Sequence, residues 1–207
     1  MSHTLEFYFD CSSPWTWLAF EYAQRRLADL DVAIAWKPIL VGGVFNTVNP
    51  SVYAARENPV PAKAAYMRKD LQDWARFVGV EIGWPAVFPV NSVKAMRGAI
   101  FALEQDCLVA YARAVFKRYW TDLADISQDD VLGAVVESVG LDRAAFFAAI
   151  ASPPYKDRLR ENTEELIARG GFGSPTLFLD GDDMYFGNDR VDLLRWRIEQ
   201  LDGGPRA

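Results

Sequence analysis

The chain has 207 residues, of which 51% are hydrophobic, 14% aromatic and 24% charged, and its formal net charge is −6. This aromatic content excludes an intrinsically disordered chain, and the negative charge argues against a strongly basic nucleic-acid binder. The length accommodates one domain, or one domain that carries a large insertion. No run of about 18 apolar residues occurs, so we expect neither a membrane span nor a membrane partner.

Cysteine and histidine are scarce in this sequence. Cys11 and Cys107 are too few for a disulfide framework or a thiolate metal cluster, and the first residues lack the basic start and apolar stretch of a signal peptide. A reducing cytoplasm is therefore the expected location. His3 is the only histidine and lies near a terminus that we expect to be disordered. No Ser-His-Asp triad, Cys-His pair or histidine-based metal site follows from such a sequence, and we expect no metal.

The first forty residues have a strand–helix–strand pattern. The aromatic-rich segment 5–10 (LEFYFD) predicts a buried strand, and Ser13 followed by Pro14 is typical of a helix start. Apolar residues at helical spacing continue toward Asp31, and 32–40 (VAIAWKPIL) predicts a second strand. A strand–helix–strand unit of this length places its two strands parallel.

The middle of the chain is predicted to be mostly helical. Glycines and prolines indicate a loop over 41–64, and prolines indicate an extended segment over 80–92. Apolar residues at helical spacing indicate helices between and after these segments. The predicted helices are 62–78, 93–105, 107–120, 128–138, 142–151 and 155–169.

The pattern returns to strands near the end of the chain. Segments 176–180 (TLFLD) and 184–186 (MYF) flank the turn 181–183, which predicts a hairpin. A last helix is expected to follow and to run to about Leu201. Its expected boundary residues are Asn188 or Asp189 as the cap, and Gly203, Gly204 and Pro205 as the end.

This order of elements is βαβ, then helices, then ββα. It predicts an α/β protein with a thioredoxin-like fold and a large all-helical insertion, partly by analogy of layout. Residues 1–45 and 170–207 are expected to form the thioredoxin-like domain, and residues 46–169 the helical insertion domain.

The N-terminus of the first helix is the expected ligand site, because α/β sheets bind ligands beyond the carboxyl ends of their parallel strands. The candidate residue there is Ser13. On its position alone, Ser13 is equally a plain helix-capping serine, with Ser12 as the other candidate cap. A helix N-terminus carries about half a positive charge and free N–H donors, which would stabilise a bound thiolate.

Three motifs together resemble one protein family. FYFDCSSPWTWLAFE, FPVNSVKAMR and FGSPTLFLDGDDMYFGNDR, from the start, middle and end of the chain, resemble the 2-hydroxychromene-2-carboxylate isomerase family. That family is related to the kappa-class glutathione transferases, in the DsbA-like branch of the thioredoxin superfamily. The resemblance implies glutathione as the cofactor and the interconversion of 2-hydroxychromene-2-carboxylate and trans-o-hydroxybenzylidenepyruvate in naphthalene-type catabolism. It also implies reversible addition of the glutathione thiolate to this small aromatic carboxylate.

The sequence departs from the DsbA pattern at the redox motif. Where a DsbA-like oxidoreductase has two cysteines separated by two residues, this chain has Ser13-Pro14-Trp15-Thr16. No intramolecular dithiol can form there, which disfavours protein disulfide oxidation. Cys11 is either a small buried hydrophobic residue or a reactive thiol, and Cys107 is expected to be structural.

The resemblance implies roles for particular residues. Ser13 would be the catalytic residue and would bind the sulfur of glutathione. The Ser174–Pro175 bond would be cis, with the backbone N–H and C=O of Ser174 paired to the cysteinyl unit. The γ-glutamyl end would lie at the start of the last helix, which on sequence alone is a plain helix cap. The residues implied there are Gly187, Asn188 and Asp189.

Further contacts follow from the resemblance at the middle of the chain. Asn58 would contact glutathione, although its neighbour Glu57 departs from the family pattern; Lys63 is either an anion-binding charge or a solvated surface lysine. The residues expected to bind the aromatic substrate are Asn91, Ser92, Trp15 and Phe88, with Phe45 and Trp84 as further flat walls. Ser92 lies where the family often has a tyrosine, which leaves the native substrate open.

Other functions remain open on the sequence. A kappa-like glutathione transferase or peroxidase would use the same thiolate site. A DsbA-like oxidoreductase would have to use Cys11 alone, and a non-catalytic glutathione-binding module would need no turnover at all. A homodimer is compatible with the sequence, while Asp122, Asp125, Asp129 and Asp130 are expected to form a solvated surface.

Overall fold

A computed structural model describes residues 2–203 of the chain. Its sheet has the strand order β2-β1-β3-β4, with β1 parallel to β2 and antiparallel to β3, and β4 antiparallel to β3. The predicted parallel pair and the predicted hairpin are therefore confirmed. The strands are β1 (His3–Phe9), β2 (Val32–Pro38), β3 (Thr176–Leu179) and β4 (Asp183–Phe186).

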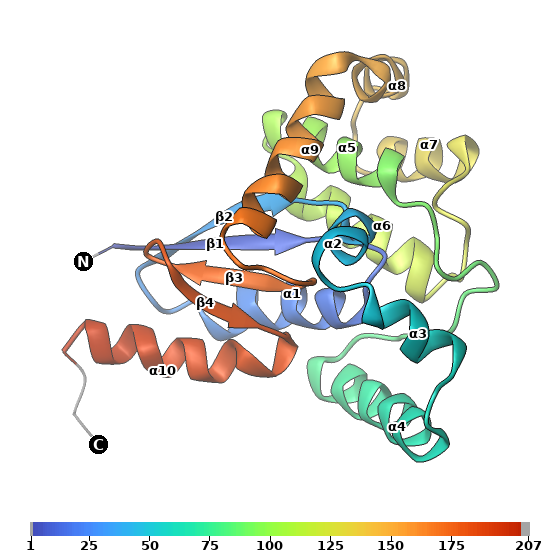
Figure 1. The fold of residues 1–207 in the computed structure, drawn as a ribbon. Helices are drawn as coiled ribbons and strands as arrows, with labels where there is room; N and C mark the ends of the chain where they lie inside the picture. Colours follow the sequence, from blue (N-terminus) through green and yellow to red (C-terminus); the bar gives the residue numbers. More distant parts are fainter. Residues whose placement is uncertain (1, 204–207) are drawn as a thin grey trace.

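Helices occupy most of the chain between β2 and β3, as Figure 1 shows. This arrangement confirms the predicted α/β thioredoxin-like fold. In chain order the helices are α1 (Pro14–Arg26), α2 (Val41–Val48), α3 (Ser51–Glu57), α4 (Pro61–Val78), α5 (Val93–Glu104), α6 (Leu108–Trp120), α7 (Asp129–Ser138), α8 (Arg143–Ala151), α9 (Pro153–Ala168), the 3-10 helix η1 (Asn188–Arg190) and α10 (Val191–Leu201).

The strand β1 forms the centre of the core, because Leu5, Phe7 and Phe9 are fully buried on one face and Tyr8 is fully buried on the other. Phe9 packs against Phe20 of α1, with ring centroids 6.1 Å apart. On the opposite face, Tyr8 packs with Phe178 of β3 and Leu166 of α9. Alternating side chains therefore bury both surfaces of the sheet, as expected for a strand covered by helices on both sides.

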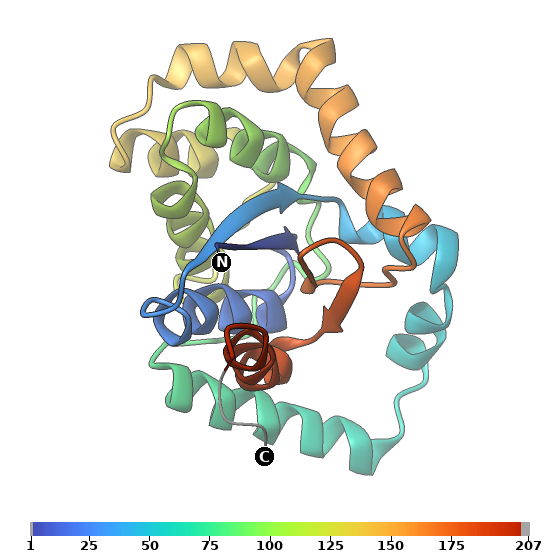
Figure 2. The ribbon, with the colours of Figure 1, turned by 90° about the vertical axis from the view of Figure 1, so that its left-hand side faces the viewer.

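Two groups of helices cover the sheet. Helices α1 and α10 lie on one face and α9 lies on the other (Figures 1 and 2). Helices α5 to α8 pack on one another beyond β2, and α4 packs along α1. The carboxyl end of β1 and the N-terminus of α1 are thereby framed by α2, α3 and the segment before β3 (Figure 2).

The predicted loop over 41–64 is wrong, because α2 and α3 form there. Val44 is fully buried, and a side chain on Gly43 would reach Thr163 of α9 at 3.4 Å. Helix α2 thus packs on a helix far away in sequence, and that packing outweighs the low helix propensity of its two glycines. Because α2 begins at Val41, the predicted boundary between residues 45 and 46 lies inside a helix, and the two-domain division stays a prediction.

Two expectations about the ends of the chain are also wrong. His3 belongs to β1 and is only 7% exposed, so it is not part of a disordered terminus. Its ring nitrogens lie 2.5 Å from Asp180 and 3.2 Å from Asp202, which explains its order. At the other end, neither Asn188 nor Asp189 caps a helix through its side chain, because η1 precedes α10.

Two sequence predictions concern the end of the last helix and membrane-spanning helices. The last helix ends at Leu201, while Gly204 and Pro205 lie outside the described residues. Within residues 2–203, none of the helices combines the length and the apolar character that crossing a membrane requires.

Candidate functional site

The carboxyl end of β1 leads into a buried aspartate. Asp10 is fully buried, and its carboxylate accepts hydrogen bonds from Ser12 N (2.9 Å), Val41 N (2.9 Å) and the Ser92 hydroxyl (3.0 Å). Burial raises the pKa of Asp10, and these hydrogen bonds act in the opposite direction. Asp10 therefore holds together the starts of α1, α2 and α5 around one carboxylate.

Ser13 caps α1, as one of the two sequence interpretations predicted. Its hydroxyl oxygen accepts from Thr16 N at 3.2 Å, and the hydroxyl donates to the Ser174 carbonyl at 3.3 Å. Pro14 has no N–H, and the Trp15 N–H has no acceptor among residues 2–203. The start of α1 therefore keeps one hydroxyl and one free N–H beside the segment that contains Ser174.

The Ser174–Pro175 bond is cis, as predicted. The Ser174 hydroxyl oxygen accepts from Asp10 N at 3.1 Å and is hydrogen-bonded to the Thr16 hydroxyl at 2.8 Å. The expectation that the Ser174 carbonyl is free is wrong, because it accepts from Ser13. In the described chain the Ser174 N–H has no acceptor, so one of its two backbone groups is available to a ligand.

The segment before α10 lies against the cis-proline. Gly187 N donates to the Pro175 carbonyl at 3.2 Å. Gly187 has a φ of +105°, a backbone conformation that favours glycine, and a Cβ there would lie 2.7 Å from Asp189 Oδ1. The carboxylate of Asp189 also pairs with Arg190 at 3.2 Å. Asn188 is 6% exposed, and its side-chain nitrogen is buried without a hydrogen-bond partner in the described chain.

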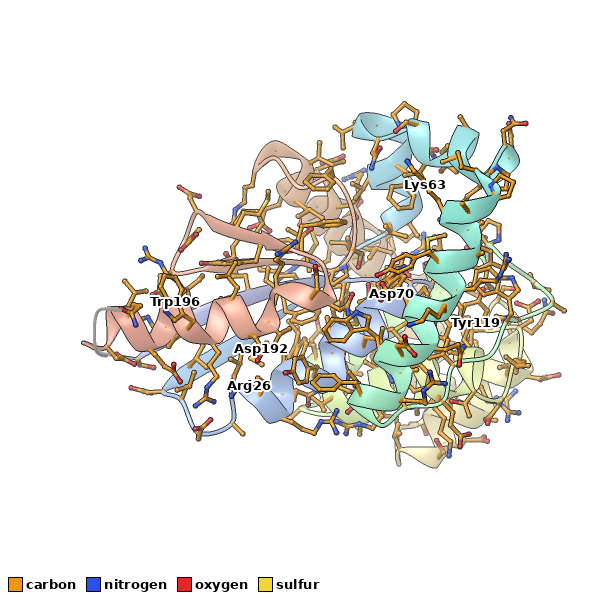
Figure 3. The ribbon with its side chains drawn as sticks, turned by 90° about the horizontal axis from the view of Figure 1, so that it is seen from below. Arg26, Lys63, Asp70, Tyr119, Asp192 and Trp196 are labelled. Carbon is orange, nitrogen blue, oxygen red and sulfur yellow. The ribbon has the colours of Figure 1, made fainter. Side chains whose placement is uncertain are left out.

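Five of the predicted glutathione residues therefore form one connected set: Ser13, Ser174, Pro175, Gly187 and Asp189. Asn58 and Lys63 lie apart from this set. Asn58 directly follows α3, and Lys63, labelled in Figure 3, lies in the first turn of α4. Both residues are exposed. No contact in residues 2–203 joins either of them to Ser13 or Ser174, so their roles stay predictions.

The predicted substrate residues separate in space. Ser92 is 2% exposed and its hydroxyl is directed at Asp10, so it serves the buried network where we expected a pocket wall. Asn91 is exposed, and its side-chain oxygen accepts from Val93 N at 3.1 Å at the start of α5. Trp15 is partly buried against the main hydrophobic core.

Phe88 lies in a group of aromatic rings that reaches the site. Its ring centroid is 4.8 Å from Trp84 and 6.1 Å from Trp120, and the Trp120 indole N–H donates to the Cys11 carbonyl at 3.0 Å. Trp84 is 57% exposed. A flat apolar surface therefore begins next to the residue that precedes Ser12 and Ser13.

Both cysteines are free thiols, and the surroundings of Cys11 make it unreactive. Cys11 is fully buried, and burial together with the nearby Asp10 carboxylate raises its pKa well above the ordinary value. The interpretation of Cys11 as a small buried hydrophobic residue is therefore the one that the structure supports. Cys107 is partly buried, and its thiol donates to the Val139 carbonyl at 3.7 Å.

Comparison with known proteins places this geometry in a family. The family described as DSBA-like thioredoxin domain matches residues 4–199. A 2-hydroxychromene-2-carboxylate isomerase from Pseudomonas putida is 31% identical over 200 residues, which cover 95% of each chain. This chain belongs to the 2-hydroxychromene-2-carboxylate isomerase family.

This member of the isomerase family is also similar to a solved structure and to a glutathione transferase. A solved structure of a 2-hydroxychromene-2-carboxylate isomerase superposes with a TM-score of 0.80 and 29% identity, covering 96% of this chain and 95% of the other. Human glutathione S-transferase kappa 1 is 27% identical over 99% of this chain and 95% of its own. The predicted relationship to both groups is confirmed, and so is the prediction of an isomerase-class enzyme.

Some residues of this isomerase family member were missed by the sequence analysis. Asp10 could have been found, because a carboxylate that ends an apolar strand is unusual and needs partners. Thr16, whose hydroxyl meets Ser174, had no distinguishing sequence signal. Within residues 2–203, no three histidine, cysteine, aspartate or glutamate side chains gather in a way that could hold a metal ion.

Proposed function

We propose that this protein is a glutathione-dependent isomerase that interconverts 2-hydroxychromene-2-carboxylate and trans-o-hydroxybenzylidenepyruvate. The single observation that carries the proposal is the Ser13 hydroxyl at the start of α1, hydrogen-bonded to Ser174, at a site without an accessible cysteine. Such a site can stabilise a thiolate but has no thiolate of its own. Relatives at 31% identity that are named for this isomerase reaction support the same activity.

The described residues fit an extended peptide such as glutathione. The Ser174 N–H lacks an acceptor, and the buried Asn188 amide nitrogen lacks one as well, so two donors are ready for ligand oxygens. A buried donor without a partner costs about 1–3 kcal/mol, which a bound ligand would recover. Relatives named glutathione S-transferase kappa support glutathione as that ligand.

In this proposal each part of the site holds one part of the peptide. Ser174 N–H pairs with the cysteinyl unit, as an added strand would. Asn188 and Asp189 hold the γ-glutamyl end, whose carboxylate and ammonium they complement. Asn58 and Lys63 complete the contacts from the α3–α4 junction. When bound, glutathione supplies the sulfur nucleophile that adds reversibly to the conjugated substrate.

The residues of this chain lower the pKa of the bound thiol. The Ser13 hydroxyl now donates to the Ser174 carbonyl, and a rotation about its Cβ–Oγ bond redirects it to the sulfur while Oγ still accepts from Thr16 N. The free Trp15 N–H and the positive end of α1 act in the same direction. Trp84 and Phe88 provide the flat surface for the aromatic ring.

The test is a spectrophotometric assay of the chromene acid with and without glutathione, followed by measurement of the glutathione that remains. Isomerisation that requires glutathione and leaves its amount unchanged is the expected result. Loss of glutathione in proportion to product would instead identify a kappa-like transferase. Glutathione binding without turnover of any aromatic acid would identify a binding module, and turnover without glutathione would contradict the proposal.

The proposal includes the cellular compartment, the binding partner and the oligomeric state of the enzyme. Two free cysteines suit a reducing cytoplasm, where glutathione is abundant. The partner is a small aromatic carboxylate, with neither nucleic acid nor membrane involved. A homodimer completes the proposal, and light scattering at several concentrations would test it.

A further inference from the structure

Arg56 lies between two aromatic rings at the edge of the candidate site. It belongs to the last turn of α3, a helix without buried residues, and it is exposed. Its guanidinium carbon is 5.5 Å from the ring centroid of Phe45 and 5.4 Å from that of Phe88. Both distances are within the range of a cation–π interaction, so the side chain is held in place by rings on two sides.

The two rings belong to the two sides of the site. A Cβ on Gly173 would lie 3.7 Å from the Phe45 ring, so Phe45 borders the segment that contains Ser174. Phe88 packs on Trp120, whose indole N–H bonds to the Cys11 carbonyl just before the start of α1. Arg56 therefore spans the two segments that carry the proposed thiolate site.

Arg56 makes no ion pair with any residue in the range 2–203. Some other arginines do form ion pairs, for example Arg113 with Glu21 at 2.7 Å and Arg169 with Glu6 at 2.8 Å. A guanidinium that is fixed by rings yet lacks a carboxylate is arranged to receive one from a ligand, because its planar N–H groups match a carboxylate in a bidentate manner.

The neighbouring surface defines what kind of ligand carries that carboxylate. Trp84 is 57% exposed and its ring centroid is 4.8 Å from that of Phe88. An aromatic acid that stacks on this surface brings its carboxylate toward the guanidinium beside Phe88. An aliphatic carboxylate would lack the ring–ring contribution that an aromatic acid gains from the exposed indole.

We propose that Arg56 binds the carboxylate of the aromatic acid substrate while Trp84 and Phe88 stack on its ring. The identity of the acid rests on the proposed function, but the recognition of an aromatic carboxylate does not. Glutathione also carries carboxylates, so the experiment must separate the two sources of this group.

The experiment measures binding by calorimetry, with cinnamate and its neutral analogue cinnamamide as probes and glutathione present. The unchanged protein is expected to bind cinnamate more tightly than cinnamamide. Arg56→Gln is expected to weaken cinnamate about five- to tenfold and to leave cinnamamide unchanged, with Arg56→Lys in between. The matched control is Arg158→Gln in α9, beside Trp36 and Ile100, which removes the same charge elsewhere.

Three outcomes would overturn the assignment. An equal loss for cinnamate and cinnamamide would make Arg56 a packing residue, and weaker glutathione binding in Arg56→Gln would assign it to the peptide. Equal binding of both probes to the unchanged protein would remove the carboxylate site altogether. An unchanged melting temperature in Arg56→Gln shows that the variant is folded.

The same experiments distinguish failure of the proposed isomerase function from failure of the role proposed for Arg56. If the chromene acid is not turned over but cinnamate is preferred in an Arg56-dependent way, the isomerase proposal fails and the carboxylate site stands. If the chromene acid is turned over and Arg56→Gln raises its KM about five- to tenfold with little change in kcat, both proposals stand. Turnover with an unchanged KM in Arg56→Gln would overturn the role of Arg56 alone.

Discussion

The candidate site has a buried part around Asp10 and an exposed part around Arg56, and the charged groups of these two parts differ in whether the protein supplies their partners. Around Asp10, the carboxylate is fully buried and three donors satisfy it. Around Arg56, the charge is exposed, lies between two rings and has no carboxylate partner in the described chain. The first region is closed by the protein itself, whereas the second leaves an interaction for a ligand to complete.

This difference distinguishes residues that stabilise the fold from residues that bind a ligand. A buried charge whose partners are removed destabilises the fold, because no water can replace them. An exposed charge whose partner is a ligand changes affinity and leaves the fold intact. Substitutions at the two ends of the site should therefore affect different measurements, and the predictions below test that separation in order of decreasing effect.

Asp10→Ala is expected to lower the free energy of unfolding by about 3 to 5 kcal/mol, because it leaves the donors of Ser12, Val41 and Ser92 without an acceptor. Urea denaturation measures this change. Asp10→Asn is the control: it keeps an acceptor oxygen and loses the buried charge, so a smaller loss is expected. Equal stability of Asp10→Ala and the unchanged protein would contradict the closed character of this region.

Ser13→Ala is expected to lower kcat/KM about 10- to 150-fold, because one hydrogen bond to a charged group contributes about 1.5–3 kcal/mol. The pKa of the bound glutathione thiol, followed by thiolate absorbance, should rise in this variant. Ser13→Thr keeps the hydroxyl that caps α1 and should retain most of the activity. An unchanged thiol pKa together with unchanged turnover would remove Ser13 from the mechanism.

The stability of the fold is expected to depend on pH through His3, which lies at the start of β1. Hydrogen bonds to Asp180 and Asp202 raise its pKa above the ordinary value of 6.5, against the effect of burial. The charged ring therefore stabilises the fold fully below pH 6.5, and this contribution is lost as pH rises through the raised pKa. Because the carboxylates are partly exposed, the contribution is about 1 kcal/mol. His3→Gln should remove this pH dependence in thermal unfolding; an identical profile would contradict the prediction.

Cys11→Ala is expected to change kcat/KM by less than about twofold, because a fully buried Cys11 acts as a small hydrophobic side chain. The same assay with Cys107→Ala provides the matched control. Abolished turnover in Cys11→Ala alone, together with a glutathione mixed disulfide on Cys11 by mass spectrometry, would move the protein to a monothiol redox enzyme.

The sequence predicts those features that depend on local spacing. The parallel pair β1–β2, the hairpin β3–β4 and the cap at Ser13 follow from periodicity and turn residues within short segments. The cis bond before Pro175 was implied by the family resemblance and not by local spacing, because most X-Pro bonds are trans. These features involve residues close in the chain, or motifs whose residues are themselves adjacent.

Features that depend on distant partners could not be predicted. The helix α2 packs on α9, more than a hundred residues later in the chain, and Gly43 lies beside Thr163 in that contact. Ser92 turns to Asp10, although its neighbours suggested a pocket wall. His3 is ordered by carboxylates near the other end of the chain, and Arg56 is fixed by rings from two separate segments. Only the tertiary fold brings these groups together.

The burial of Cys11 has a consequence for oxidative damage. Oxidation to sulfenic and higher acids requires an accessible thiolate, and a fully buried thiol with a raised pKa offers neither the access nor the charge. Under the proposed function, the nucleophilic sulfur belongs to glutathione, and an oxidised glutathione molecule can leave the site and be replaced. An oxidant would then consume a replaceable ligand and spare Cys11, so mass spectrometry after mild peroxide treatment should find Cys11 unoxidised.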